Sequence, residues 1–226
     1  MNKYFHQIIL PQSCFLCGDS STQTLCTACL ADLPYHNNTA SCIYCAKSLE
    51  TEGVCSECQT QSPPYTKTQA IFSYIYPIDK LIIAAKFDQN LAVLNLLGKL
   101  MAQHLTIDPR PDILIPVPLH AKRLRQRGYN QSLELAKPIT KQTGIPLDYK
   151  TCKRIKNTRP QTSLSAKQRQ NNLVGAFSVQ RHPPQHWQHI VLIDDVMTTG
   201  TTVTELAKVW LETGVQRVDV WCCARA

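Results

Sequence analysis

The chain has 226 residues, of which 43% are hydrophobic and 18% are charged, and its formal net charge is +8 at pH 7. These proportions are typical of a soluble globular protein and exclude an intrinsically disordered one. No apolar run approaches the roughly 20 residues that span a bilayer, and residues 1–10 contain too short an apolar core for a signal peptide. We therefore expect a cytoplasmic protein with no membrane span, with one good-sized core and a small extra module.

The positive charge is concentrated in one part of the chain. Residues 119–181 hold fourteen basic residues against two acidic ones, a net charge of +12, whereas residues 1–60 hold two basic and five acidic residues, a net charge of −3. A solvated basic face is one interpretation of such a block. A phosphate-rich partner is the other, and we favour it because the block lies between two segments with ligand-binding character.

Cysteine dominates the first part of the chain, where four successive Cys-x-x-Cys pairs fall within residues 14–58. Two such pairs supply the four thiolates of a tetrahedral zinc site. Pairing neighbours closes the shorter loops and predicts two structural zinc sites, Cys14, Cys17, Cys26 and Cys29 in the first and Cys42, Cys45, Cys55 and Cys58 in the second. Interleaved pairing and an iron–sulfur cluster are alternatives, whereas a disulfide framework does not suit a chain without a secretion signal.

A composition break at 61–64 divides the chain into two predicted domains. Residues 1–62 form a double zinc-ribbon-like module, which has few large apolar residues and therefore depends on its metal ions to fold. Residues 63–226 form the second domain.

The second domain alternates predicted strands and helices. An aromatic and β-branched strand is expected over 69–76, followed by two helices between 78 and 100 with a turn at 88–90. A short buried strand over 112–118 ends in prolines. A stretch dense in positive charge comes next, and its basic residues are Lys122, Arg123, Arg125 and Arg127.

Beyond this stretch we expect a helix over 133–139, divided or kinked at Pro138, and a strand near 146–149. Residues 153–172 are polar and basic, with a capping box at Ser165 that predicts a short helix, and they suit a lid over a phosphorylated ligand. A loosely ordered surface hairpin is the alternative. A last strand over 218–223 buries Cys222 and Cys223, and these thiols, like Cys152, are interpreted as packing residues.

The most informative segment is 189–204. Four apolar residues (190–193) predict a buried parallel strand, two carboxylates follow, and a hydroxyl-rich loop then leads into a helix. Backbone N–H groups at such a loop bind phosphate, and aspartates at the carboxyl end of a strand can accept hydrogen bonds from ribose hydroxyls. The predicted site for a phosphorylated sugar comprises Asp194, Asp195, Thr198, Thr199, Gly200, Thr201 and Thr202.

This segment resembles the PRPP-binding motif of the type I phosphoribosyltransferase fold, in which four apolar and two acidic residues precede Thr-Thr-Gly-x-Thr. The resemblance implies an α/β domain with a mostly parallel sheet flanked by helices. It also implies that the loop carrying Lys122, Arg123, Arg125 and Arg127 cradles the pyrophosphate of PRPP, with Mg²⁺ bridging the pyrophosphate oxygens.

The whole chain resembles the ComF family, which joins a zinc module to a phosphoribosyltransferase-like domain. The resemblance rests on the cysteine pairs and the PRPP motif, and on the segments 116–131 and 159–177. It implies a role in natural transformation, in which ComF proteins handle incoming single-stranded DNA, with a DNA-uptake or DNA-processing protein as a further partner. The candidate DNA-binding residues are Arg127, Lys153, Arg154, Lys156, Arg159, Lys167 and Arg169.

Two functional hypotheses follow. In the first, the basic segment binds the backbone of single-stranded DNA and the PRPP pocket serves regulation or an unidentified transfer; the basic segment contains few aromatic residues, which limits base stacking there. In the second, the chain is an active phosphoribosyltransferase of nucleotide metabolism that uses PRPP and Mg²⁺. No segment identifies an acceptor base, so the sequence leaves open whether the protein is an enzyme.

Overall fold

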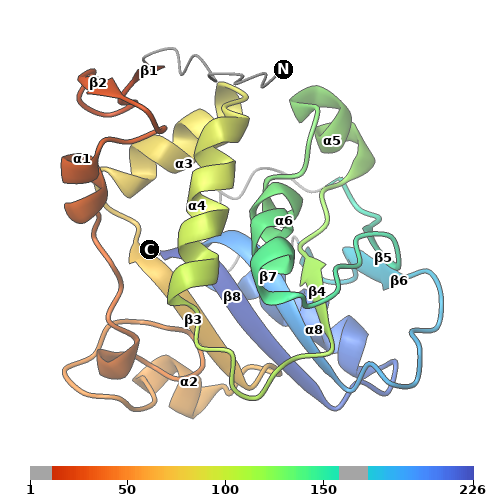
Figure 1. Ribbon diagram of the computed structural model, residues 1–226. Helices are drawn as coiled ribbons and strands as arrows, with labels where there is room; N and C mark the ends of the chain where they lie inside the picture. The colour runs from red at the N-terminus through yellow and green to blue at the C-terminus, as the bar shows by residue number, and fades with distance from the viewer. Residues whose placement is uncertain (1–11, 158–172) are drawn as a thin grey trace, which may run out of the picture.

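The computed structural model describes residues 12–157 and 173–226, and a four-stranded parallel sheet forms its centre (Figure 1). The strand order is β3-β8-β7-β4, and every neighbouring pair is parallel. The strands are β3 (Lys67–Ser73), β4 (Ile113–Pro116), β7 (His189–Met197) and β8 (Arg217–Arg225). The predicted α/β fold with a mostly parallel sheet is therefore confirmed.

Helices cover both faces of this sheet, as β7 illustrates. Val191 and Ile193 face the core beneath three helices, and Ile190 and Leu192 face the opposite core beneath a fourth. Because both faces are covered, the strand is apolar without alternation, as its sequence predicted. The three helices are α3 (Ile78–Phe87), α4 (Leu91–His104) and α6 (Gln131–Thr143), and the fourth is α8 (Thr201–Leu211).

Helices α4 and α6 approach each other closely at a glycine. A Cβ atom at Gly98 would lie 2.6 Å from the carbonyl oxygen of Leu135 and 3.0 Å from Cγ of Pro138, so no larger residue fits there without movement. Pro138 lies inside the single continuous helix α6, which it does not divide. The turn expected between α3 and α4 is present, and the Asn90 side chain caps α4 by accepting from the Val93 N–H at 3.1 Å.

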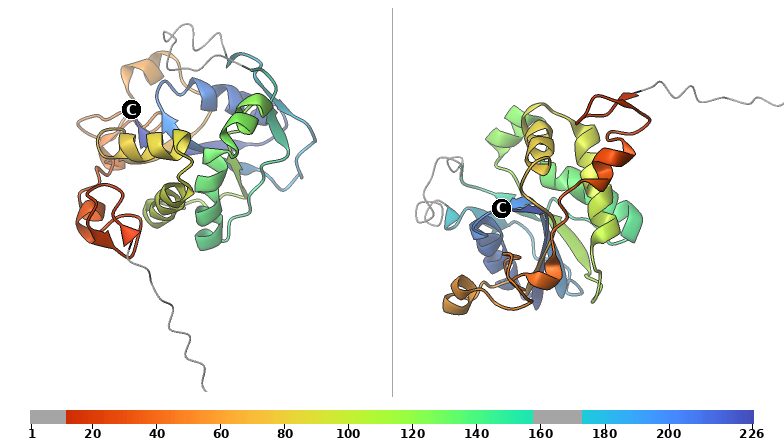
Figure 2. Two further views of the ribbon diagram at one scale, coloured as in Figure 1. Left: turned by 90° about the horizontal axis from the view of Figure 1, so that it is seen from above. Right: turned by 90° about the vertical axis from the view of Figure 1, so that its left-hand side faces the viewer.

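The two cysteine-rich ribbons pack against opposite faces of the sheet (Figures 1 and 2). Cys14, Leu25 and Leu33 of the first ribbon join the core beneath α3 and α4, whereas the second ribbon joins the core on the α8 side. The short elements of the two ribbons are β1 (Gln12–Ser13), β2 (Ser20–Ser21), α1 (Thr27–Ala31), η1 (Asn38–Ala40) and α2 (Ser56–Thr60).

The segment that connects the ribbons runs along β3, the edge strand of the sheet. The carbonyl of Pro34 accepts from the Ser73 N–H at 2.9 Å, and the His36 N–H donates to the Ile71 carbonyl at 2.9 Å. Further along, the Thr68 N–H donates to the carbonyl of Ile43 at 2.9 Å. The connection thus satisfies backbone groups that an open sheet edge would leave exposed.

Three local predictions need correction or lie outside the described residues. The basic stretch is a helix, α5 (Ala121–Arg127), and not a loop, because its residues are strong helix formers and Gly128 ends it in the left-handed conformation. The strand expected near 146–149 is only an isolated bridge from Leu147 to Leu114. The pairing instead lies in β5 (Cys152–Arg154) and β6 (Phe177–Val179), which are antiparallel. The helix expected at Ser165 lies outside the described residues.

Among the described residues, no helix is both long enough and apolar enough to cross a membrane.

Candidate functional site

The eight paired cysteines form two clusters with the predicted local pairing. In each cluster the four Sγ atoms lie within 4.8 Å of one another. Cys17 and Cys26 have their sulfurs 3.7 Å apart, as do Cys45 and Cys55. A tetrahedral zinc ion with Zn–S bonds of about 2.3 Å requires sulfur separations of about 3.8 Å. The donor set therefore fits zinc, with four thiolates and no open position at each site, as in structural zinc sites.

One thiol in each cluster is predisposed to ionise. Burial opposes ionisation of Cys14, but backbone groups of Cys17 and Cys26 that bond to its sulfur lower its pKa below the usual thiol range. Cys42 behaves in the same way, because backbone groups of Cys55 and Cys45 outweigh its burial. Since zinc binds the thiolate form, this backbone arrangement favours metal binding.

The acidic pair of the predicted phosphosugar site lies in the C-terminal half of β7 and is buried. Asp194 Oδ1 accepts from the N–H of Asp195 at 2.9 Å, and the hydroxyl of Ser132 on α6 lies 3.4 Å from the same oxygen. Lys86, on the last turn of α3, places its Nζ 2.7 Å from Asp195 Oδ2. Burial, reinforced by the charge of Asp195, raises the pKa of Asp194 above its ordinary value. The pair therefore combines one carboxylate held by a lysine with one carboxyl that readily holds a proton.

The loop after β7 meets α8 in a geometry suited to an anion. Gly200 adopts the left-handed conformation with φ +73° and forms the N-cap of α8. It has no side chain to occupy the N–H groups of the first turn, which carry the positive end of the helix dipole. The hydroxyls of Thr199 and Thr201 lie 2.8 Å apart beside it. One hollow is lined by Asp194 and by the residues from Val196 to Val203, so it brings together all the predicted PRPP residues except Asp195, which does not line it.

Arg154 lies near the acidic pair, and Arg123 lies near Arg154. Arg154 on β5 is buried, and its guanidinium lies 5.6 Å from the centre of the Phe177 ring. Burial and the positive charge of Arg123 on α5 lower the pKa of Arg154 to about 10, and Asp194 opposes that shift. Arg154, predicted as a DNA-binding residue, therefore lies within electrostatic reach of the phosphosugar site.

The other predicted basic residues spread over the surface. Arg127 is half-buried, and its Nη1 donates to Gln131 Oε1 at 2.6 Å. The exposed ones among the described residues are Lys122, Arg125, Lys153 and Lys156. Three further candidates, Arg159, Lys167 and Arg169, lie outside the described residues.

An arginine links the second ribbon to the loop after β7. Arg225, at the end of β8, donates from Nε to the carbonyl of Cys45 at 2.7 Å and from Nη1 to the carbonyl of Met197 at 3.1 Å. The buried Tyr65 lies beside Gly200, where an added Cβ would be 3.0 Å from the tyrosine hydroxyl. The backbone of Cys45 and the loop after β7 are thus held by the same arginine, so we expect the order of the loop to depend on the folding of the ribbon.

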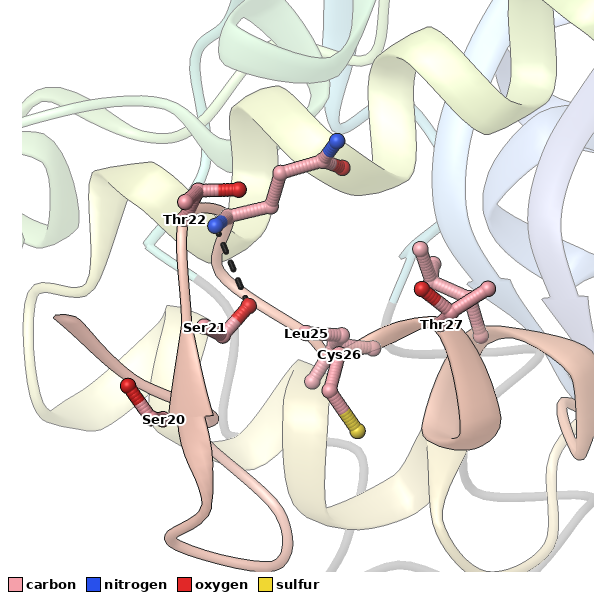
Figure 3. Close-up of a pocket in the computed structure, with 8 residues that line it drawn as sticks. Ser20, Ser21, Thr22, Leu25, Cys26 and Thr27 are labelled. Carbon is pink, nitrogen blue, oxygen red and sulfur yellow. Dashed lines mark hydrogen bonds between the residues drawn. The ribbon is translucent and has the colours of Figure 1, made fainter. Parts of the chain in front are cut away.

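A separate hollow lies on the first ribbon (Figure 3). Small polar side chains, among them Ser20, Ser21 and Thr27, line it together with Leu25 and Cys26. The N–H of Gln23 donates to the Ser21 hydroxyl at 3.1 Å. Cys26 is already a member of the first cysteine cluster, and the rest of this lining supplies hydroxyl, amide and apolar groups, so we assign no chemistry to the hollow.

Sequence reasoning missed Lys86 and Ser132 as parts of the site. In the sequence, Lys86 is indistinguishable from any lysine in the last turn of an amphipathic helix, and Ser132 from any polar residue in the first turn of a helix. Neither lies in a recognisable motif, because each reaches the acidic pair only through the packing of its helix over the sheet.

Comparison with known proteins agrees with this architecture. A family model described as the double zinc ribbon domain matches residues 5–59. The chain is 35% identical to competence protein F of Haemophilus influenzae over 213 residues, which cover 89% of this chain and 90% of that protein. It is 37% identical to DNA utilization protein YhgH of Salmonella typhi, over 76% of this chain and 77% of that protein, and 24% identical to competence protein ComFC of Bacillus subtilis, over 76% and 72%. On this similarity, and with its two Cys₄ ribbons and its parallel sheet, the chain belongs to the ComF family.

Proposed function

We propose that this protein acts in DNA uptake, where it binds incoming single-stranded DNA in the cytoplasm and holds a phosphoribosyl ligand such as PRPP in the pocket at the end of β7. The observation that carries the proposal is that Asp194 and the glycine turn before α8 line one hollow, with Arg154 within electrostatic reach of Asp194. The names of the relatives, which refer to competence and DNA utilization, support the DNA part.

The chemistry of the pocket suits a phosphorylated ribose. Asp194 and Asp195 can bond to the ribose hydroxyls, and the N-terminus of α8 can hold the 5′-phosphate. Arg123 and Arg154 supply positive charge on the α5 side for a pyrophosphate, and Mg²⁺ would be held largely by pyrophosphate oxygens. The Nζ of Lys86 lies 2.7 Å from Asp195 Oδ2 and fixes the orientation of this side chain, which can accept hydrogen bonds.

The exposed cations can bind a nucleic-acid backbone without reading its sequence. Lys122 and Arg125 lie on α5, and Lys153 and Lys156 lie on or just after β5, which is joined to the start of α5 by a bridge between His120 and Arg154. Each phosphate contact releases counterions, so the affinity should fall with salt, with a slope of about −0.7 per phosphate for a single strand.

The first test is fluorescence anisotropy of a labelled, mixed-sequence single strand at several salt concentrations, with and without PRPP and Mg²⁺. We expect tight binding that weakens steeply with salt, and a Lys153→Gln/Lys156→Gln variant with a smaller salt slope than a Lys141→Gln control. An affinity that changes when PRPP is added would show coupling of the two sites. The absence of binding at low salt would contradict the DNA part of the proposal.

The second test addresses the pocket by calorimetric titration of PRPP with Mg²⁺. Asp194→Ala/Asp195→Ala should abolish binding, and Glu212→Gln, at the far end of α8, is the control. Because the aspartates are buried and their loss can destabilise the fold, Thr199→Ala provides a second variant at an exposed position. Unchanged PRPP binding in both variants would contradict the pocket assignment.

An active phosphoribosyltransferase is the alternative, and the resemblance of residues 190–202 to the PRPP-binding motif favours it. Pyrophosphate release from PRPP in the presence of purine or pyrimidine bases would support turnover. Release that depends on Asp194 and Asp195 would establish the enzyme, whereas binding without release would leave PRPP as a regulatory ligand.

A further inference from the structure

Helix α3 and the residues just before it present an apolar stripe to solvent. The side chains are Ile75 (58% exposed), Tyr76 (64%), Ile83 (47%) and Phe87 (70%). The opposite side of the helix, which carries Ile78, Leu81, Ile82 and Ala85, is buried in the core. Large apolar side chains that are exposed singly need no explanation, but two on α3 together with two just before it do. We call Ile75, Tyr76, Ile83 and Phe87 the α3 stripe.

A cation lies over each aromatic ring of the α3 stripe. Lys80 Nζ is 5.6 Å from the centre of the Tyr76 ring, and the guanidinium carbon of Arg127 on α5 is 5.7 Å from the centre of the Phe87 ring. The neighbouring acidic side chains are Asp79 and Asp88. Aromatic rings interleaved with cations are typical of surfaces that bind single-stranded nucleic acid, in which bases stack on the rings and phosphates meet the cations.

The α3 stripe ends at the phosphosugar site. The last turn of α3 makes three successive contacts: the carbonyl of Ala85 accepts from the Tyr129 hydroxyl, Lys86 pairs with Asp195, and Phe87 meets Arg127. Figure 1 shows α3 and α5 at the top of the view, the side toward which the strands point, and Figure 2 shows the same helices from above. Phe87 is therefore adjacent in sequence to Lys86, whose ammonium group pairs with Asp195.

We propose that the α3 stripe is the base-stacking surface for single-stranded DNA, with bases on Tyr76 and Phe87 and the backbone on Lys80 and Arg127. The inference rests on the proposed function, because it assumes that the protein binds single strands. It also resolves a difficulty of the basic segment, which carries many cations but few aromatic rings. The rings come from a part of the chain more than thirty residues earlier, which α3 and α5 bring together.

The stacking is tested with two strands of equal length, roughly 15 nucleotides: oligothymidine and a strand of abasic sites that retains only sugar and phosphate. Phe87→Ala and Tyr76→Ala should each weaken binding of oligothymidine roughly 5- to 150-fold, and leave binding of the abasic strand unchanged. Phe87→Trp should retain wild-type affinity for oligothymidine. Tyr149→Ala is the matched control, because Tyr149 is also exposed and has Lys150 Nζ 5.7 Å from its ring centre.

The outcomes separate this inference from the function on which it rests. If the wild-type protein binds neither strand, the proposed function itself fails. If the wild-type protein binds oligothymidine and the Phe87 and Tyr76 variants bind it equally well, the α3 stripe is not a stacking surface, although DNA binding stands. A loss confined to Tyr149→Ala would move the bases to the β5–β6 side and overturn the inference. Zinc content and thermal unfolding of each variant establish that it is folded.

Discussion

The ion pair between Lys86 and Asp195 offers the sharpest test of how the site is built. The Nζ–Oδ2 distance is 2.7 Å, and the side chains of Lys86 and Asp195 are only 21% and 8% exposed. Removing one partner of a buried pair costs about 3–5 kcal/mol, because the remaining charge is buried without compensation. Since Lys86 retains some solvent contact, we expect Lys86→Met to lower the free energy of unfolding by about 3 kcal/mol, the lower end of that range.

The assay is urea unfolding followed by circular dichroism, in buffer that keeps both cysteine clusters loaded with zinc. Lys80→Met, on the same helix but exposed, is the control and should change the free energy by less than about 0.5 kcal/mol. Asp195→Asn in the Lys86→Met background should restore part of the loss, because it removes the uncompensated charge. The reasoning is refuted if Lys86→Met is as stable as Lys80→Met, or if Asp195→Asn restores nothing.

Three further predictions concern the carboxyl, the zinc ions and the turn. Burial raises the pKa of Asp194, so the folded state holds this proton more tightly than the unfolded chain, and stability falls as pH rises from the ordinary carboxyl pKa to the raised one. The Tm of Asp194→Asn relative to wild type should therefore increase with pH across that window, and a pH-independent difference would contradict this. Cys17 is exposed whereas the second cluster is entirely buried, so a chelating dye should remove zinc in two phases. The Cys17→Ser variant should lack the fast phase and the Cys45→Ser variant the slow one. A single phase of zinc release from the wild-type protein would contradict this prediction. Gly200→Ala places a Cβ 2.9 Å from a methionine methyl at φ +73°, whereas Gly144→Ala at φ +69° meets nothing closer than 3.6 Å. Both should lose about 1–3 kcal/mol through backbone strain, and urea unfolding should show the larger loss for Gly200→Ala.

Much of the fold was predictable because its signals are local. The apolar run before Asp194 identified the central strand, since a strand covered on both faces has no polar alternation. The cysteine spacing predicted two Cys₄ clusters, and their local pairing is confirmed. The basic stretch was predicted as a loop because, in the phosphoribosyltransferase fold that the sequence resembles, a loop binds the pyrophosphate of PRPP. Helix propensity over Ala121–Arg127, followed by glycine, indicates the helix that the structure contains.

The relation of the ribbons to the sheet was not predictable. Composition indicated a module over residues 1–62 followed by a second domain. In the structure, Cys14 and Leu25 are buried with α3 and α4, whereas the second ribbon is buried with α8, and its Cys45 carbonyl accepts a hydrogen bond from Arg225 at the end of β8. Hydrophobic periodicity identifies which side of a short segment is buried, but it carries no information about which of two sheet faces will cover it.

The sequence by itself determined the strands and long helices of the central sheet, the two cysteine clusters, and the acidic pair with the glycine turn that follows it, because each depends on residues close together in the chain. The tertiary structure alone decided which distant side chains complete the site. Lys86 and Ser132 reach the aspartates from two helices that pack over one face of the sheet, and Arg154, on the separate strand β5, comes within electrostatic reach of Asp194. These contacts depend on helix position and strand order, which long-range packing sets and no local pattern encodes.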